Sequence, residues 1–158
     1  MYCLDTGVFI HSWHFWYAKK NYPTFWTGIE QLAEEKRLGI PPQVLEELEE
    51  EKDELYKWCK DREEILIWEP NEFTEAFYSE MVNSYPGLAT SHIGVGRNYA
   101  DLYVVATAQI YNAAVVTTEK LDRSKKIKIP DICKDHDIDC LQPYDIIKNE
   151  GWVFRHKK

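Results

Sequence analysis

The stretch NYADLYVVATAQIYNAAVVT, residues 98–117, predicts the fold class of this chain more strongly than any other segment. Its first part, Asn98–Tyr111, is dense in alanine and valine and fits a buried helix. Its last part, Ala114–Thr117, is a short apolar run of the kind that forms an interior strand. A helix that leads directly into a buried strand is the repeating unit of an α/β protein.

The rest of the chain alternates in the same way. We expect further strands at Tyr2–Leu4, Ile65–Trp68 and Ile138–Leu141. Helices are expected from about Val8, over Thr24–Lys36, from Pro42 to about Lys60 and over Pro143–Glu150. A further helix should follow Asn71 as its cap and bury Phe73, Phe77 and Met81. Helices that alternate with short apolar strands predict a three-layer α/β/α fold, in which helices cover both faces of a central parallel sheet.

Length and composition predict one cytoplasmic domain that spans residues 1–158. The chain has 27 acidic and 19 basic residues, a net charge of −8, so its surface should repel nucleic acid unless a local basic patch or bound metal holds it. The four cysteines lack the spacing of a metal site or a disulfide framework, which favours reduced thiols. A signal peptide and a membrane-spanning run of about 20 apolar residues are not expected from this sequence.

Two acidic residues follow predicted strands. Asp5 comes directly after Tyr2–Leu4, and Glu119 follows Ala114–Thr117 after one threonine. Ligands of parallel sheets collect beyond the carboxyl ends of the strands, so these two acids are candidate functional residues.

Asp101 is a third candidate, because it lies on the apolar face of its predicted helix with Val104, Val105 and Ala108. A carboxylate on that face loses solvent and needs a cation or a raised pKa. The alternative is an acid that the helix dipole favours in the first turn, or one that pairs with Arg97.

The acidic run 46–51 supplies a fourth candidate. Glu47 lies at the border of the apolar stripe that includes Val44 and Leu48, where a side chain can reach a cleft. Glu51 lies one turn later and is the second choice. The other glutamates of the run fit a solvated helix face.

Four segments of the chain resemble the signature segments of PIN-domain ribonucleases, in the expected order: LDTGVFI, VLEEL, NYADLYVVATA and VVTTEK. The resemblance implies metal-site acids at Asp5, Glu47, Asp101 and Glu119, supporting hydroxyls at Thr6 and Thr117, and a sheet of about five parallel strands. Two departures stand out. Gly7 replaces a small polar residue, and Glu119 stands where Asp is commoner, so that Asp122 is an alternative to it.

A set of carboxylates predicts a site for Mg²⁺ or Mn²⁺, because hard cations prefer oxygen ligands. With the resemblance, this implies hydrolysis of RNA by metal-activated water. The resemblance further implies the toxin of a type II toxin–antitoxin system, a homodimer neutralised by an antitoxin protein. Two alternatives remain at this point: a catalytically degenerate module of the same fold that binds a protein, and a Mg²⁺-dependent phosphoesterase that acts on a small nucleotide.

Candidate contacts to RNA fall into two groups. Arg97, Arg123, Lys125 and Lys126 could hold phosphates near the carboxylates, although a solvated loop explains the basic run 123–128 equally well. The aromatic segment 13–26 could stack unpaired bases, but packing in the core or in a dimer is the stronger expectation for it.

Overall fold

The computed structural model describes residues 1–89, 99–121 and 126–155 of the chain. Within this part, four strands form one parallel sheet in the order β2-β1-β3-β4. Their bounds are β1 (Tyr2–Leu4), β2 (Leu38–Gly39), β3 (Ala114–Val116) and β4 (Cys140–Leu141). The predicted strands at 2–4, 114–117 and 138–141 are confirmed, each within two residues of its expected end.

The prediction of about five strands is wrong for the described residues, because the expected strand Ile65–Trp68 does not form. A short helix occupies residues 63–66, and only Ile67 forms a bridge, to Ile40. One edge strand of the sheet is β2, which forms in a segment expected only to end a helix. Position 39 of β2 is glycine because a Cβ there would collide with the indole of Trp68, which covers that position.

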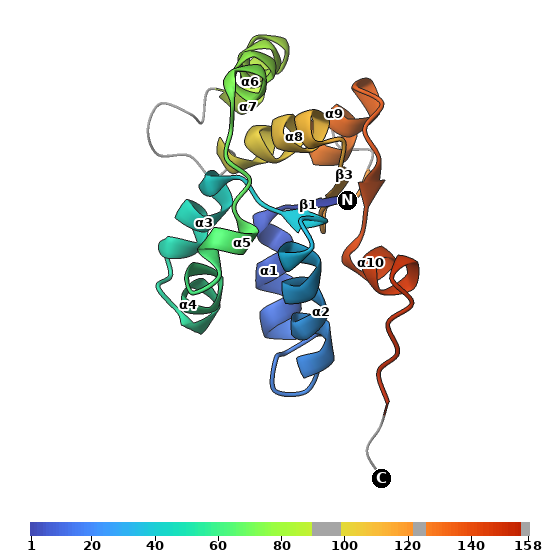
Figure 1. Cartoon of the computed structure of the whole chain (residues 1–158). Helices are drawn as coiled ribbons and strands as arrows, with labels where there is room; N and C mark the ends of the chain where they lie inside the picture. Colours follow the sequence, from blue (N-terminus) through green and yellow to red (C-terminus); the bar gives the residue numbers. More distant parts are fainter. Residues whose placement is uncertain (90–98, 122–125, 156–158) are drawn as a thin grey trace.

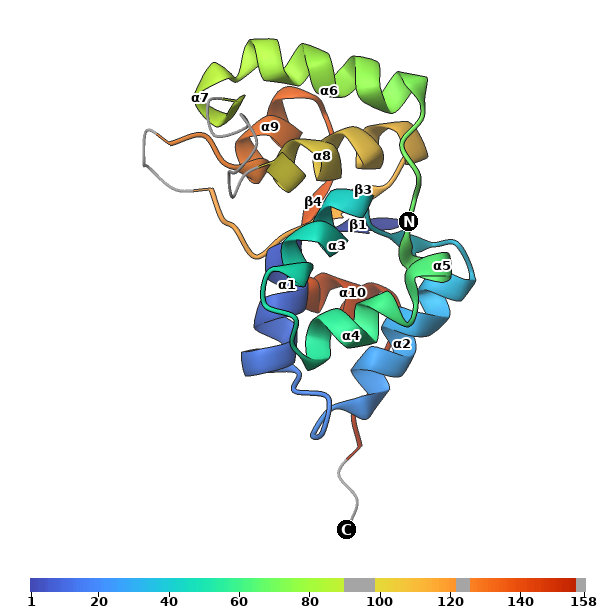
Figure 2. The same ribbon diagram turned by 90° about the vertical axis from the view of Figure 1, so that its left-hand side faces the viewer.

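Helices cover both faces of the sheet, as expected (Figures 1 and 2). The helical elements are α1 (Thr6–His11), η1 (Ser12–Trp16), α2 (Pro23–Glu34), α3 (Pro42–Glu49), α4 (Glu54–Lys60), α5 (Glu63–Leu66), α6 (Glu72–Ser84), α7 (Pro86–Ala89), α8 (Tyr99–Tyr111), α9 (Ile129–Asp135) and α10 (Pro143–Asn149). One face carries α8 and α9, with α6 packed on the outside of α8, and the other carries α1, α2 and α10. α3 contacts both α1 and α8.

The helix expected from Pro42 to about Lys60 is two helices. α3 ends at Glu49, Lys52 adopts a left-handed φ of 49°, and the side chain of Asp53 accepts a hydrogen bond of 2.9 Å from the Tyr56 amide at the start of α4. A residue with positive φ cannot continue an α-helix, so the chain turns here.

The predicted core is largely confirmed. Asn71 caps α6 through its side chain, and Met81 is fully buried, whereas Phe77 is partly buried and Phe73 is 63% exposed. Phe73 lies on the outer surface of α6, so its predicted burial is wrong. The four cysteines are free thiols. None of the helices in the described ranges is long and apolar enough to cross a bilayer.

Candidate functional site

Asp5 lies where β1 meets β3. Its amide donates a hydrogen bond of 2.9 Å to the carbonyl of Val116, the last residue of β3, and its backbone caps α1. Its side chain is 5% exposed, and Oδ2 accepts a hydrogen bond of 3.0 Å from the buried hydroxyl of Thr117. Thr117 therefore supports Asp5 from the neighbouring strand end.

Glu47 reaches the same region from α3. The hydroxyl of Thr6, the first residue of α1, donates to its Oε2 at 2.5 Å. Its Oε1 is buried and has no hydrogen-bond partner among the described residues. Burial raises the pKa of Glu47, against the lowering effect of the Thr6 hydroxyl and the nearby Ala100 amide. A buried oxygen without a partner is suited to a cation.

Asp101 lies in the first turn of α8. Burial, followed by the charges of Asp5, Glu119 and Glu47, raises its pKa to about 8, against a lowering by Lys126. Asp5 shows the same pattern, since burial and the charges of Glu119 and Glu47 raise its pKa to about 7 despite the Thr117 hydrogen bond. The desolvation that the sequence predicts for Asp101 is present. Its alternative partner, Arg97, lies outside the described residues.

Glu119 is more constrained than the other three. Its amide donates to the Thr117 hydroxyl at 3.1 Å, and its Oε2 accepts from the Ile129 amide, at the start of α9, at 2.9 Å. The side-chain amide of Gln142 donates to its backbone carbonyl at 2.8 Å. One carboxylate oxygen of Glu119 is thus engaged in holding α9. The alternative, Asp122, lies outside the described residues.

One pocket of about 460 Å³ joins all four candidate carboxylates. Its lining consists of Asp5, Thr6, Gly7, Ile10, His11, Glu47, Glu50, Glu51, Asp101, Thr118 and Glu119. Glu51, the alternative to Glu47, is therefore at the pocket too, but it is exposed, whereas Glu47 is more than half buried and bonded to Thr6.

The donor set fits a hard divalent cation, although it is not a closed ligand set. In the described ranges, no three His, Cys, Asp or Glu side chains already converge on a point that would hold one ion. Ionised carboxylates repel one another, which opposes closer approach without a cation. The four candidate carboxylates offer only oxygen donors, and Glu47 Oε1 has no hydrogen-bond partner among the described residues, so these four side chains suit a hard divalent cation.

Two residues that the sequence did not single out as functional line this pocket. His11 Nδ1 and Thr118 Oγ1 are 3.0 Å apart and form a hydrogen bond. Thr118 also explains Gly7, because a Cβ at Gly7 would lie 2.9 Å from Thr118 Oγ1 and 3.3 Å from Asp5 Oδ2. The space that a small polar residue would fill is taken by Thr118. The pairing depends on the meeting of two distant segments, so no local pattern predicts it.

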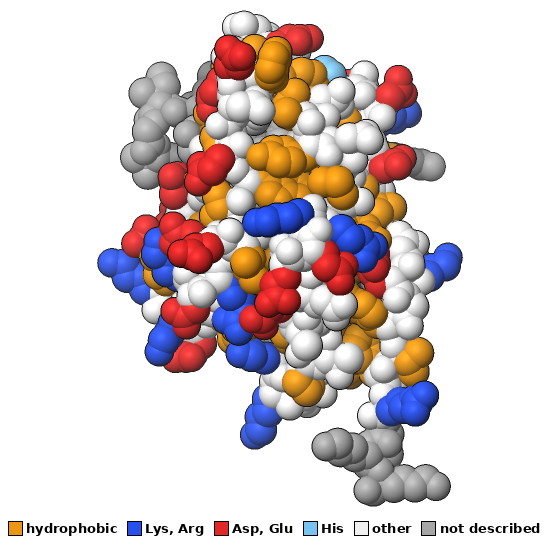
Figure 3. All heavy atoms as spheres, in the orientation of Figure 1, with side chains coloured by type: hydrophobic (Ala, Val, Ile, Leu, Met, Phe, Trp, Pro, Cys, Tyr) orange, Lys and Arg blue, Asp and Glu red, His pale blue; other side chains and the backbone are white. Residues whose placement is uncertain are grey.

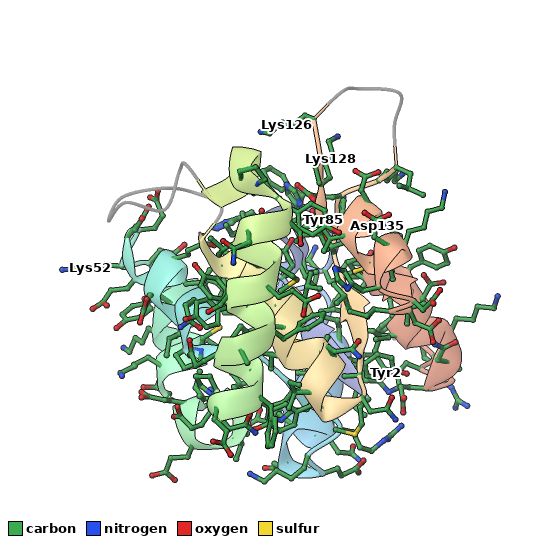
Figure 4. The ribbon with its side chains drawn as sticks, turned by 90° about the horizontal axis from the view of Figure 1, so that it is seen from above. Tyr2, Lys52, Tyr85, Lys126, Lys128 and Asp135 are labelled. Atoms are coloured by element: carbon green, nitrogen blue, oxygen red, sulfur yellow. The ribbon has the colours of Figure 1, made fainter. Side chains whose placement is uncertain are left out.

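Lys126 is the one predicted RNA contact that the structure describes. Its side chain is exposed, and its charge lowers the pKa of Asp101, which places it within electrostatic range of the pocket. Lys126 and Lys128 lie on the same segment, before α9 (Figure 4). Arg97, Arg123 and Lys125 lie outside the described residues. The face in Figure 3 mixes acidic and basic side chains and shows no broad basic patch.

Comparison with known proteins gives one family and one fold. The model of a family described as "Domain of unknown function (DUF4411)" matches residues 2–154. The crystal structure of VapBC2 from Rickettsia felis bound to a DNA fragment from their promoter is similar, with a TM-score of 0.52 and 18% identity, and the match covers 89% of this chain and 97% of that one. Among curated protein sequences, none matches. The fold is that of PIN-domain proteins, as the sequence resemblance implied.

Proposed function

We propose that the carboxylate pocket of this protein, which belongs to the DUF4411 family, hydrolyses phosphodiester bonds of RNA with the help of Mg²⁺ or Mn²⁺. The observation that carries the proposal is the meeting of Asp5, Glu47, Asp101 and Glu119 in one pocket, from four separate segments of the chain. The PIN-like fold supports the proposal. These four acids also occupy the positions that the resemblance to PIN-domain ribonucleases implies for metal ligands.

The side chains of the pocket divide into ligands and supports. Asp5 and Asp101 are the proposed principal ligands, and Glu47 and Glu119 complete the set or orient water. The hydroxyls of Thr117 and Thr6 donate to Asp5 and Glu47 and hold these carboxylates in orientation. When bound, the divalent ion supplies a nucleophilic water and offsets charge on the phosphoryl oxygens.

The raised pKa values of Asp5 and Asp101 connect binding to protons. With pKa values of about 7 and about 8, both carboxyls hold protons for part of the time near neutral pH. A cation competes with these protons, so ion binding releases them and strengthens as pH rises. Lys126, and the undescribed Arg97, Arg123 and Lys125, are the proposed contacts to RNA phosphates.

The test is cleavage of a single-stranded RNA by the purified protein with Mn²⁺, with Mg²⁺ and with EDTA. Asp101→Asn and Glu47→Gln should lower kcat/KM by more than about 100-fold, because each removes a proposed ligand. Glu46→Gln is the matched control, since Glu46 is the exposed neighbour of Glu47 on the same helix. Equal activity of Glu47→Gln and Glu46→Gln would remove Glu47 from the site, and full activity of a folded Asp101→Asn protein would refute the proposal.

We further propose that the protein is the toxin of a type II toxin–antitoxin system, with an antitoxin protein as partner and a second copy of itself as a dimer partner. The sequence resemblance and the likeness to VapBC2 support this. The test is co-expression with the product of the neighbouring reading frame. Expression of the protein alone should slow growth, and co-expression of the neighbouring product should restore growth and lead to co-purification of the two proteins. Growth that is slowed equally with and without the neighbouring product would contradict the role.

A further inference from the structure

The aromatic segment after α1 splits into a buried part and an exposed part. Trp13 packs edge-on against Trp26 at a centroid distance of 4.9 Å, and Tyr17 stacks on Phe25 at 4.4 Å. These contacts confirm core packing for much of the segment. Phe15 and Trp16 differ, since they are 71% and 45% exposed.

A π-helical turn is responsible for this split. In η1, the Tyr17 amide donates to the Ser12 carbonyl at 2.8 Å, a bond that spans five residues instead of four. The wider turn changes the phase of the side chains, so that Phe15 and Trp16 face away from the core that Trp13 enters. His14, next to Phe15, is 3.4 Å from the carboxylate of Asp53 and links η1 to the start of α4.

The two exposed rings are continuous with the carboxylate pocket through His11. The His11 ring lies 5.3 Å from that of Trp16 and 6.1 Å from that of Phe15, centroid to centroid. His11 and Ile10 line the pocket, and His11 is hydrogen-bonded to Thr118, which also lines it. Of the two exposed rings, Trp16 is therefore the nearer to His11 at the wall of the pocket.

We propose that Trp16, flanked by Phe15, is a stacking site for an unpaired nucleobase of the RNA whose phosphate lies in the carboxylate pocket. This inference rests on the proposed function. A stacking contact suits a chain of net charge −8, because it adds affinity for RNA without a further phosphate contact on a surface that repels phosphates. An aromatic ring offers a base a π face without regard to its identity, and a duplex does not present that face. The site therefore selects single-stranded RNA with little sequence preference.

The main test is binding in the Asp101→Asn background, which separates binding from cleavage. The anisotropy of a fluorescein-labelled single-stranded RNA should report a Kd that Trp16→Ala raises roughly tenfold, whereas Trp16→Phe keeps a ring and most of the affinity. Phe73→Ala is the matched control, because Phe73 is 63% exposed, between the values for Trp16 and Phe15, but lies on α6. It should leave the Kd unchanged, and all the variants should keep the melting temperature of the Asp101→Asn parent.

A modified substrate distinguishes stacking from an indirect effect. The same RNA is then made with a single abasic nucleotide at each position in turn. At one position, loss of the base should weaken binding to the protein that retains Trp16 but not to the Trp16→Ala protein. An unchanged Kd for Trp16→Ala, or a loss that persists at every abasic position, would overturn the inference. So would a shift from dimer to monomer in sedimentation caused by Trp16→Ala, because the rings would then face a second copy. Failure of the wild-type protein to cleave RNA, with the Trp16 effect on binding intact, would refute the proposed nuclease and leave the stacking site.

Discussion

At the scale of single residues, the pocket depends on close agreement between small groups. A Cβ at position 7 and the Thr118 hydroxyl would occupy the same volume beside Asp5, and that hydroxyl is hydrogen-bonded to His11. A side chain at position 7 could be accommodated only if Thr118 rotated and gave up that hydrogen bond. The departure from the PIN pattern at Gly7 is thus matched by Thr118.

This coupling predicts a change of sign for one substitution. Gly7 lies in α1, where alanine is favoured over glycine by up to about 1 kcal/mol, so Gly7→Ala would stabilise the protein if space allowed. In the native background, we expect the contact with Thr118 to cancel this gain or reverse it. In a Thr118→Ala background, the gain should appear. Urea unfolding of the four proteins measures both effects, and equal effects of Gly7→Ala in the two backgrounds would show that the contact does not matter.

At the scale of elements, the break between α3 and α4 separates the helix that carries Glu47 from the helix that supports η1. Its components are Lys52 with positive φ and Asp53 as the cap of α4, and Lys52 points away from the protein in Figure 4. Asp53 also pairs with His14. This one side chain therefore ends a turn and contacts the segment that presents Trp16.

The N-cap of α4 and the His14 contact, both made by Asp53, can be separated by mutation. Asp53→Ala removes both and should destabilise the protein by about 1 kcal/mol, the usual cost of losing an N-cap. Asp53→Asn keeps a capping oxygen and loses only the charge, so it should stay within a few tenths of a kcal/mol of the wild type, as exposed ion pairs contribute little. Thermal melts at neutral pH measure both. Equal destabilisation by the two variants would assign the effect to the His14 pair instead.

At the scale of the whole molecule, two acids of the pocket, Asp5 and Asp101, couple folding to pH. Burial raises the pKa of Asp5 to about 7 and that of Asp101 to about 8, well above the ordinary value of 3.8. Between pH values near 3.8 and those near 8, the folded protein therefore binds more protons than the unfolded chain. The resulting stabilisation is complete below the ordinary pKa and is lost as pH rises through the folded values.

Metal-free protein should therefore lose several kcal/mol of stability on going from pH 5 to pH 8, because each pKa unit corresponds to about 1.4 kcal/mol. Asp101→Asn should flatten this profile and should be more stable than the wild type at pH 8 but not at pH 5. Mn²⁺ should restore stability to the wild type at pH 8, since it replaces the protons, and should do less at pH 5. Chemical denaturation at both pH values, with EDTA or Mn²⁺, measures this, and a flat profile for the metal-free wild type would contradict the burial of both carboxyls.

The predictions from sequence succeeded where one local signal was sufficient. α8 and β3 follow from a long run of helix formers and a short apolar run, and α6 follows from its Asn71 cap. They failed where a neighbour decided. β2 is two residues long, Ile67 forms only one bridge, and α9 begins where Glu119 accepts the Ile129 amide, so none of these has a pattern of its own.

The sequence by itself determined the α/β class, the alternation of helices with the strands of a parallel sheet, and which acids were candidates. Periodicity and strand ends are local properties of the chain. Only the tertiary structure decided that the candidate acids share one pocket, that Thr118 and His11 complete its wall, and that Trp16 stays at the surface while Trp13 is packed. The physical reason is that these relations join residues as far apart as positions 5 and 117, which meet only when β1 and β3 pair.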